Sequence, residues 1–120
     1  MKTAFIFPGQ GSQCVGMGKD FYTNSLKARE ILDEASEALG EDLKALMFEP
    51  NELLEKTAYT QPAIFTLSAM ATALLRDSSD LKPQFALGHS LGEFSALHAS
   101  GALGLSQGVR LVHERGRLMQ

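Results

Sequence analysis

The pattern of apolar and polar positions first predicts two short strands. Residues 3–7 form a brief apolar run that ends at a Pro-Gly pair, and residues 84–87 form a second one that leads directly into a glycine. Runs this short favour buried strands of a parallel sheet, because a helix would need a longer periodic stretch. The chain is therefore expected to place one strand near its beginning and another well after its midpoint.

Between these strands, apolar residues recur at helical spacing. The clearest helix is predicted over residues 26–39, with Asn24 or Ser25 as its N-cap and Gly40 as its stop. Its apolar positions lie three and four residues apart, which places them on one face. Two shorter helices are predicted after it, over residues 42–48 and 52–56.

The pattern of apolar residues from Thr60 onward predicts three more helices. One is expected to begin at a Thr60 cap, with Pro62 in its first turn, and it carries a long apolar stripe. Another is expected over residues 90–100, directly after the second strand. A turn then precedes a last helix, for which Ser106 is the predicted cap. The stripe of the first of these helices comprises Ile64, Leu67, Met70, Ala71, Leu74 and Leu75.

This order of elements predicts an α/β fold with a parallel sheet and flanking helices. Two strands cannot complete such a sheet, because helices on its faces need several strands to cover. We therefore expect residues 1–120 to be a fragment of a larger α/β domain. A compact helical domain with one short strand pair is the alternative.

Composition excludes several functional classes. The chain has 120 residues, 44% of them hydrophobic, and a net charge of −3, which argues against nucleic-acid binding. No apolar run approaches the roughly 20 residues of a membrane helix. With Cys14 as its one cysteine, the chain can form neither an internal disulfide nor a multi-cysteine metal site. We expect a cytoplasmic protein without a metal, in which Cys14 is a small buried residue.

The glycine-rich segment FIFPGQGSQCVGMG, residues 5–18, invites comparison with phosphate-binding loops. A P-loop requires a Lys and a Ser or Thr directly after its last glycine, but Met17 follows Gly16 here. The dinucleotide fingerprint fails as well, because Cys14 stands where its third glycine is required. Phosphate binding is therefore the weaker interpretation, and a non-catalytic binding module stays open as an alternative.

A second motif, G-x-S-x-G at residues 88–92, lies between the second predicted strand and a helix. That context is typical of a nucleophile elbow, in which a strained turn presents the serine hydroxyl and the glycines allow strand and helix to approach. Ser90 and Glu93 also match an ordinary capping box, S-x-x-E. Capping gives no reason for Gly92, which weakens a helix by about 1 kcal/mol relative to Ala. We therefore favour Ser90 as a nucleophile.

An acylated serine requires two donors for its oxyanion. The backbone N–H of Leu91, at the start of the helix, is one candidate. The other is the backbone N–H of Gln10 in the first glycine-rich loop, where Gly9 and Gly11 would let the main chain come close.

Four motifs together resemble the malonyl-CoA:acyl-carrier-protein transacylase family. They are FPGQGSQ at residues 7–13, TQPA at 60–63, GHSLGE at 88–93 and ERG at 114–116. Acyltransferase domains of polyketide synthases and multifunctional fatty acid synthases carry similar motifs. The resemblance covers the chain nearly end to end, but family enzymes are longer. It implies that residues 1–120 are the N-terminal part of the large, α/β-hydrolase-like acyltransferase subdomain.

The resemblance implies a ping-pong reaction of fatty acid biosynthesis. A malonyl group would pass from malonyl-CoA to Ser90, and then to the phosphopantetheine thiol of acyl carrier protein, with the Gln10 and Leu91 amides as the oxyanion hole. Arg115 would bind the malonyl carboxylate, while Gln61 and His89 would line the site. Coenzyme A enters as a substrate thioester, and no permanently bound cofactor is implied.

Helical phase gives a separate reason to place Arg115 inside. Leu111, Arg115 and Leu118 fall at i, i+4 and i+7, whereas Arg110, Glu114 and Arg117 share the polar face. A guanidinium that points inward needs a carboxylate, and a dicarboxylic acyl substrate would supply one. A structural ion pair, or a packed stem with its charged end in water, is the alternative.

The general base is expected to be missing from the chain. In the family it is a distant histidine, and the three histidines here are unsuitable: His89 adjoins Ser90, His98 lies about 12 Å along its helix, and His113 is expected at the surface or at a helix end. We therefore expect the fragment itself to be inactive and a ferredoxin-like subdomain to lie beyond Gln120. A serine esterase or thioesterase remains the alternative enzyme. The sequence leaves malonyl against methylmalonyl selectivity open.

Overall fold

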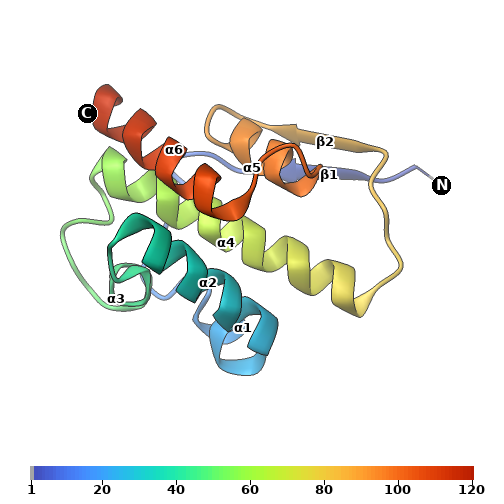
Figure 1. Ribbon diagram of the computed structural model, residues 1–120, viewed down its shortest axis with the longest axis horizontal. Coiled ribbons are helices and arrows are strands. Elements are labelled where there is room, and N and C mark those ends of the chain that lie inside the picture. The colour runs from blue at the N-terminus through green and yellow to red at the C-terminus, as the bar shows by residue number, and fades with distance from the viewer. Residues whose placement is uncertain (1) are drawn as a thin grey trace.

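A computed structural model describes residues 2–120 (Figure 1). It confirms a mixed α/β fold in which a small parallel sheet lies beside a set of packed helices. The elements, in chain order, are β1 (Ala4–Phe7), α1 (Lys19–Asn24), α2 (Leu26–Leu39), α3 (Leu43–Phe48), α4 (Thr57–Ser78), β2 (Phe85–Gly88), α5 (Gly92–Ala99) and α6 (Leu105–Met119).

The sheet consists of β1 and β2 in parallel, with Ala4 opposite Phe85 and Phe7 opposite Gly88. One face is covered by α5, where Phe5 and Phe7 pack against small residues of that helix. The opposite face is open: Ile6 is 75% exposed and Leu87 is 56% exposed. The strands are therefore buried on one face only, and not on both as a parallel strand would suggest.

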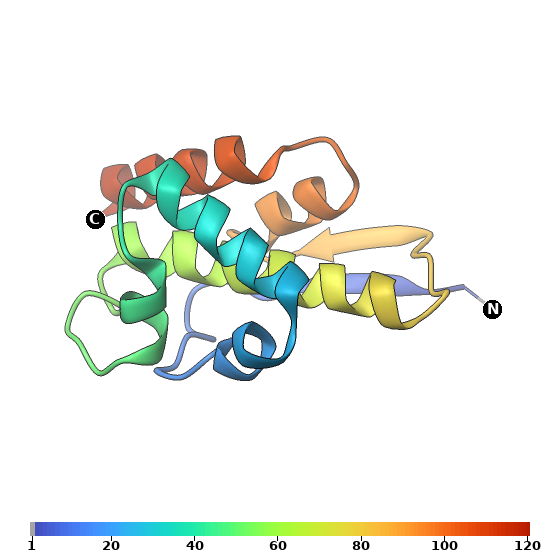
Figure 2. The same cartoon turned by 60° about the horizontal axis from the view of Figure 1, so that its bottom comes forward.

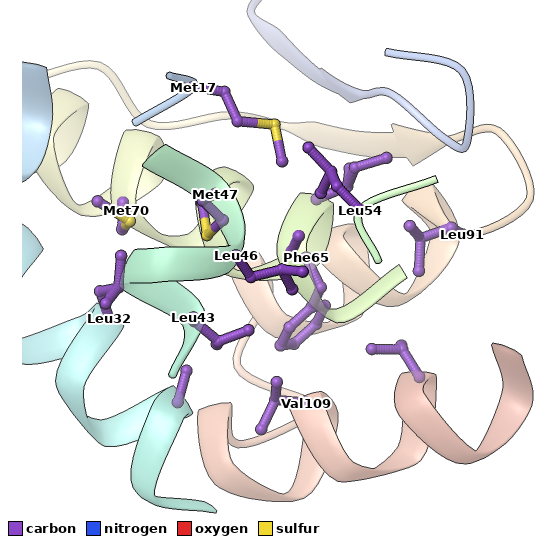
Figure 3. Close-up of a cluster of buried hydrophobic side chains, with 14 of the residues drawn as sticks. Met17, Leu32, Leu43, Leu46, Met47, Leu54, Phe65, Met70, Leu91 and Val109 are labelled. Carbon is purple, nitrogen blue, oxygen red and sulfur yellow. The ribbon is translucent and has the colours of Figure 1, made fainter. Parts of the chain in front are cut away.

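The main core lies among α2, α4 and α6, which pack against one another (Figures 1 and 2). Figure 3 shows Phe65 of α4 between Leu43, Leu46 and Val109. Helix α6 approaches α4 closely through glycines, because a Cβ at Gly108 would lie 2.3 Å from the Phe65 ring. This close packing sets the position of α6, which carries Arg115.

Helix α2 has the predicted limits. The Ser25 hydroxyl accepts a hydrogen bond from the Ala28 N–H at 3.1 Å, which makes Ser25 the cap and not Asn24. Gly40 ends the helix in the left-handed conformation, with φ of +75°. Both ends are therefore fixed by residues that the sequence identifies.

Helix α4 begins at Thr57, three residues before the predicted start at Thr60. The Thr60 hydroxyl does not cap the helix; it donates to the backbone carbonyls of Leu54 and Lys56, and its side chain is buried. Pro62 consequently lies inside the helix and not in its first turn.

Two other local predictions are also wrong. Residues 52–56 form turns and no helix, with the Asn51 side chain accepting from the Leu54 N–H at 2.9 Å. Helix α6 has Gly104 at its N-cap and no side-chain cap hydrogen bond, and the Ser106 hydroxyl donates instead to the Glu34 carboxylate at 3.3 Å. Among residues 2–120, no helix is both long and apolar enough to cross a membrane.

Candidate active site

The chain turns sharply between β2 and α5, and Ser90 lies at that corner. Ser90 has φ of +54° and is the one non-glycine residue with positive φ in the described chain. A Cβ at Gly88 would lie 1.9 Å from the Gly92 carbonyl carbon, and one at Gly92 would lie 2.2 Å from the Phe7 oxygen. Both glycines are thus sterically required, and the strained turn has the geometry of a nucleophile elbow.

Ser90 does not act as a helix cap. Helix α5 has Leu91 at its N-cap and no side-chain cap hydrogen bond. The Ser90 hydroxyl oxygen instead accepts a hydrogen bond from Arg115 Nη2 at 3.0 Å, and Ser90 is exposed. The capping interpretation is therefore wrong, and the hydroxyl is available at the surface of the corner.

Arg115 reaches Ser90 from α6 and is held by two further side chains. Its Nη1 donates to Gln61 Oε1 at 2.8 Å, and Gln61 is completely buried on α4. Its guanidinium carbon lies 5.3 Å from the centre of the Phe94 ring, within the range of a cation–π contact. Within residues 2–120, the one ion pair joins Glu114 and Arg117, so the alternative of a structural ion pair for Arg115 is not observed.

Arg115 points to the site as predicted, but the argument from helical phase was wrong. Leu111 and Leu118 are 45% and 71% exposed, so they do not form the buried stripe. The buried face of α6 consists of Gly108, Val109, Val112 and Gly116. Glycines carry no apolar side chain, and the hydropathy pattern therefore missed the face along which α6 packs most closely.

The glycine-rich loop after β1 lies against the serine corner. A Cβ at Gly9 would lie 2.6 Å from the His89 carbonyl oxygen, so Gly9 permits the close approach that was predicted. Gly11 has a different role: nothing lies within 4 Å of its Cβ position, but its φ of +111° favours glycine. The Gln10 side chain donates to Thr57 Oγ1 at 3.1 Å, which ties the loop to α4.

Two backbone N–H groups remain available at this junction. Neither Gln10 nor Leu91 donates its amide to an acceptor in the described part of the chain. Leu91 follows Ser90 directly, and Gln10 follows the glycine that contacts His89. These unpaired N–H groups can donate to a ligand oxygen.

The three histidines do not hydrogen bond to Ser90. His89 is exposed at the corner, whereas His98 Nδ1 pairs with the Leu103 carbonyl at 2.8 Å. His113 is half-buried inside α6 and its Nδ1 lies 2.8 Å from the Ala58 carbonyl oxygen, so the expectation of a surface or helix-end residue is wrong.

Other polar groups lie away from the corner. The Arg117 side chain hydrogen bonds to Glu114 and lowers the pKa of that carboxyl, while the same bond raises the pKa of Arg117. Residues 2–120 contain no group of three His, Cys, Asp or Glu residues that could hold a metal. Cys14 is exposed, contrary to expectation, in a turn where its carbonyl accepts from the Met17 N–H.

Sequence reasoning missed Phe94, whose ring lies beside the Arg115 guanidinium. A usable signal was present, because Phe94 is an aromatic residue in the first turn of α5, directly after the serine corner.

Comparison with known proteins gives a consistent result. The Acyl transferase domain family matches residues 4–120. A malonyl CoA-acyl carrier protein transacylase of Bacillus subtilis is 46% identical over 118 residues, which is 98% of this chain and 30% of that protein. A malonyl-CoA:acyl carrier protein transacylase structure from Helicobacter pylori is 53% identical with a TM-score of 0.96, covering 100% of this chain and 39% of that one.

A further solved structure contains a malonyl-transacylase in complex with a type II PKS acyl-carrier protein. It is 42% identical to this chain, with a TM-score of 0.94. The match covers 100% of this chain and 39% of that one.

The parallel strands, the strained serine corner and the guanidinium above it define an α/β protein with a candidate serine nucleophile. The chain belongs to the Acyl transferase domain family, and it corresponds to an N-terminal portion of the malonyl transacylases that it resembles. It spans 30% of the length of the Bacillus subtilis relative and 39% of the Helicobacter pylori chain.

Proposed function

We propose that the full-length protein, of which this chain is the N-terminal part, transfers malonyl groups from malonyl-CoA to acyl carrier protein in fatty acid biosynthesis. The observation that carries this proposal is the 3.0 Å contact between Arg115 Nη2 and Ser90 Oγ. It brings a carboxylate-binding group directly beside a candidate nucleophile. The names of the relatives support the same reaction.

In the first half-reaction, Ser90 Oγ attacks the thioester carbonyl of malonyl-CoA and loses its proton to a general base. The tetrahedral oxyanion is stabilised by the backbone N–H groups of Gln10 and Leu91, which have no other acceptor in residues 2–120. The C–S bond then breaks, coenzyme A leaves as its thiol, and malonyl-Ser90 remains. In the second half-reaction, the phosphopantetheine thiol of acyl carrier protein attacks this ester and releases Ser90.

Arg115 supplies selectivity for the malonyl carboxylate. Its guanidinium is planar and can bind a carboxylate through two parallel hydrogen bonds. The contact with Ser90 uses one Nη group, and a substrate carboxylate would replace the serine hydroxyl as its acceptor. Gln61 accepts from the other Nη group and the Phe94 ring lies against the guanidinium, while His89 is exposed at the corner.

The proposed base is none of the three histidines of this chain. His98 and His113 are paired with backbone carbonyls, and His89 lies beside Ser90 in sequence without bonding to its hydroxyl. Nucleophile and base act as a unit, so the 120-residue chain alone should retain only a small fraction of the activity. The remaining protein would have to supply the base.

The test is acylation of the full-length protein with radiolabelled malonyl-CoA. Label should appear on Ser90, pass to acyl carrier protein, and be lost in Ser90→Ala. Label that survives Ser90→Ala would refute the proposal. Release of the acyl group to water faster than to a thiol acceptor would favour a serine esterase or thioesterase, which shares the corner but has no use for Arg115.

A further inference from the structure

Helix α4 contains an unusual carbonyl near its beginning. In a regular α-helix the N–H of residue 62 donates to the carbonyl oxygen of residue 58, but Pro62 has no N–H. Ala58 is buried, with 4% of its surface exposed. Its carbonyl oxygen therefore needs a donor from elsewhere, because a buried backbone acceptor without a partner is costly.

His113 of α6 supplies that donor. Its Nδ1 lies 2.8 Å from the Ala58 carbonyl oxygen, across 55 residues of sequence. A carbonyl can only accept, so this contact requires a proton on Nδ1. The imidazole is also packed edge-on against Tyr59, with ring centres 5.7 Å apart. The ring is thereby fixed in both position and tautomer.

Two further contacts join α6 to the same turn of α4. A Cβ at Gly116 would lie 2.6 Å from the Thr57 carbonyl oxygen, which leaves room for glycine alone. The Ala58 N–H donates to Gln120 Oε1 at 3.0 Å. The Ala58 carbonyl is thus bonded to His113 and the Ala58 N–H to Gln120. The two helices cannot slide past each other without breaking these bonds.

Arg115 lies between these contacts on α6. Its Nη1 bonds to Gln61 of α4 and its Nη2 bonds to Ser90, so its aim depends on where α6 lies along α4. We propose that His113 is a positioning residue: by bonding the carbonyl that Pro62 leaves free, it fixes the register of α6 on α4 and directs Arg115 to the acyl carboxylate at Ser90. This inference rests on the proposed function.

The test compares His113→Leu with His113→Asn in the full-length protein. Asn can place an amide N–H close to the position of Nδ1, whereas Leu fills the space without a donor. The rates of Ser90 acylation by malonyl-CoA and by acetyl-CoA are measured well below the melting temperature of each variant. Acetyl-CoA has no carboxylate, so the ratio of the two rates reports on Arg115 and not on general stability.

We expect His113→Leu to lower the malonyl-to-acetyl ratio by about tenfold, the order expected for misalignment of one charge-assisted hydrogen bond. His113→Asn should stay within about threefold of the wild type. Arg110→Leu, an exposed position on the same helix, is the control and should leave the ratio unchanged. A normal ratio in His113→Leu would overturn the proposal.

A second measurement does not depend on activity. Nitrogen-15 NMR of the full-length protein should show His113 in the Nδ1-protonated tautomer, and the Arg115 Nε resonance should shift in His113→Leu but not in His113→Asn. An Nε2-protonated ring or an unmoved Arg115 resonance would overturn the positioning role. Absence of malonyl label on wild-type Ser90, with these NMR results intact, would instead refute the proposed function alone.

Discussion

The Arg115 guanidinium donates to the Ser90 hydroxyl oxygen at 3.0 Å, from a different helix and across 25 residues of sequence. The Ser90 side chain makes no cap hydrogen bond to the helix that follows, so its hydroxyl is free to meet a residue from another element. The contact therefore makes the candidate nucleophile and the proposed carboxylate-binding group mutually dependent. Under the proposed function, a carboxylate that engages Arg115 also frees the hydroxyl for attack.

Arg115→Lys should remove most of the discrimination between malonyl and neutral acyl groups. A lysine ammonium cannot keep the Gln61 bond and also bind a carboxylate through two parallel bonds. We expect the ratio of kcat/KM for malonyl-CoA to that for acetyl-CoA to fall by about 100-fold, with steady-state kinetics as the measurement. Arg117→Lys, on the exposed face of α6, should leave the ratio unchanged. An unchanged ratio in Arg115→Lys would mean that the carboxylate binds elsewhere.

Phe94→Leu should weaken the site for a related reason. Loss of the ring removes the cation–π contact at 5.3 Å, which is worth about 0.5–1 kcal/mol at a partly exposed position, or roughly a twofold to fivefold change. We expect KM for malonyl-CoA to rise by that factor, whereas Phe94→Tyr keeps the ring and should match the wild type. Equal effects of Leu and Tyr would point to packing and not to the guanidinium.

Gly92→Ala should destabilise the fold strongly. Its Cβ would lie 2.2 Å from the Phe7 carbonyl oxygen, so β1 and α5 would have to separate. We expect a loss of about 2–4 kcal/mol in the free energy of unfolding, measured by denaturant titration of the full-length protein. Gly104→Ala is the matched control, because its Cβ would meet only Gln107 Oε1 at 3.6 Å. A change in Gly92→Ala as small as in the control would contradict the close approach of β1 to α5.

The local part of the site was predictable from sequence, and its long-range part was not. The spacing of Gly88, Ser90 and Gly92 predicts one corner, because these residues are neighbours in sequence, whereas the approach of Gly92 to Phe7 is a long-range contact. His113 and Thr60 were misjudged since their partners are backbone carbonyls, which leave no trace in a side-chain pattern. The direction of Arg115 was right although the stripe used to infer it is exposed.

The same limit applies to the elements themselves. Helix α2 could be placed because its cap and stop are adjacent residues, Ser25 and Gly40. The start of helix α4 could not be placed, because a proline usually marks the first turn of a helix and Pro62 lies beyond that turn. The hydrogen bond that Pro62 cannot make to the Ala58 carbonyl is replaced by one from His113 of α6.

Glu114 should titrate below its ordinary range as long as Arg117 is present. The hydrogen bond from Arg117 lowers the pKa of this carboxyl, so the pair stabilises the fold above the unfolded-state pKa, and that contribution is lost as the pH falls through the folded-state pKa. NMR titration of the carboxyl should show the lowered pKa in wild type and its return towards the ordinary value in Arg117→Gln or in high salt. A Glu114 pKa that stays the same in Arg117→Gln and in high salt would contradict its pairing with Arg117.

Gly9→Ala should slow the chemical step without preventing substrate binding. Its Cβ would lie 2.6 Å from the His89 carbonyl oxygen, so the loop would move away from the corner and carry the Gln10 N–H with it. Loss of one oxyanion donor costs about 100-fold to 1,000-fold in rate, and a partial displacement should cost about 10-fold to 100-fold in kcat. KM for malonyl-CoA should stay within about threefold, because Arg115 is on α6 and does not move with the loop.

Single-turnover acylation of Ser90 is the measurement for Gly9→Ala, since it isolates the step in which the oxyanion forms. Ser12→Ala is the control within the same loop: its hydroxyl donates to the Gly9 carbonyl at 2.8 Å, and its loss leaves room at the corner unchanged. A Gly9→Ala variant that acylates as fast as the control would show that the Gln10 amide takes no part in the reaction. A fall in Gly9→Ala alone would support the pairing of the first loop with the serine corner, because the substitution changes the distance between that loop and His89.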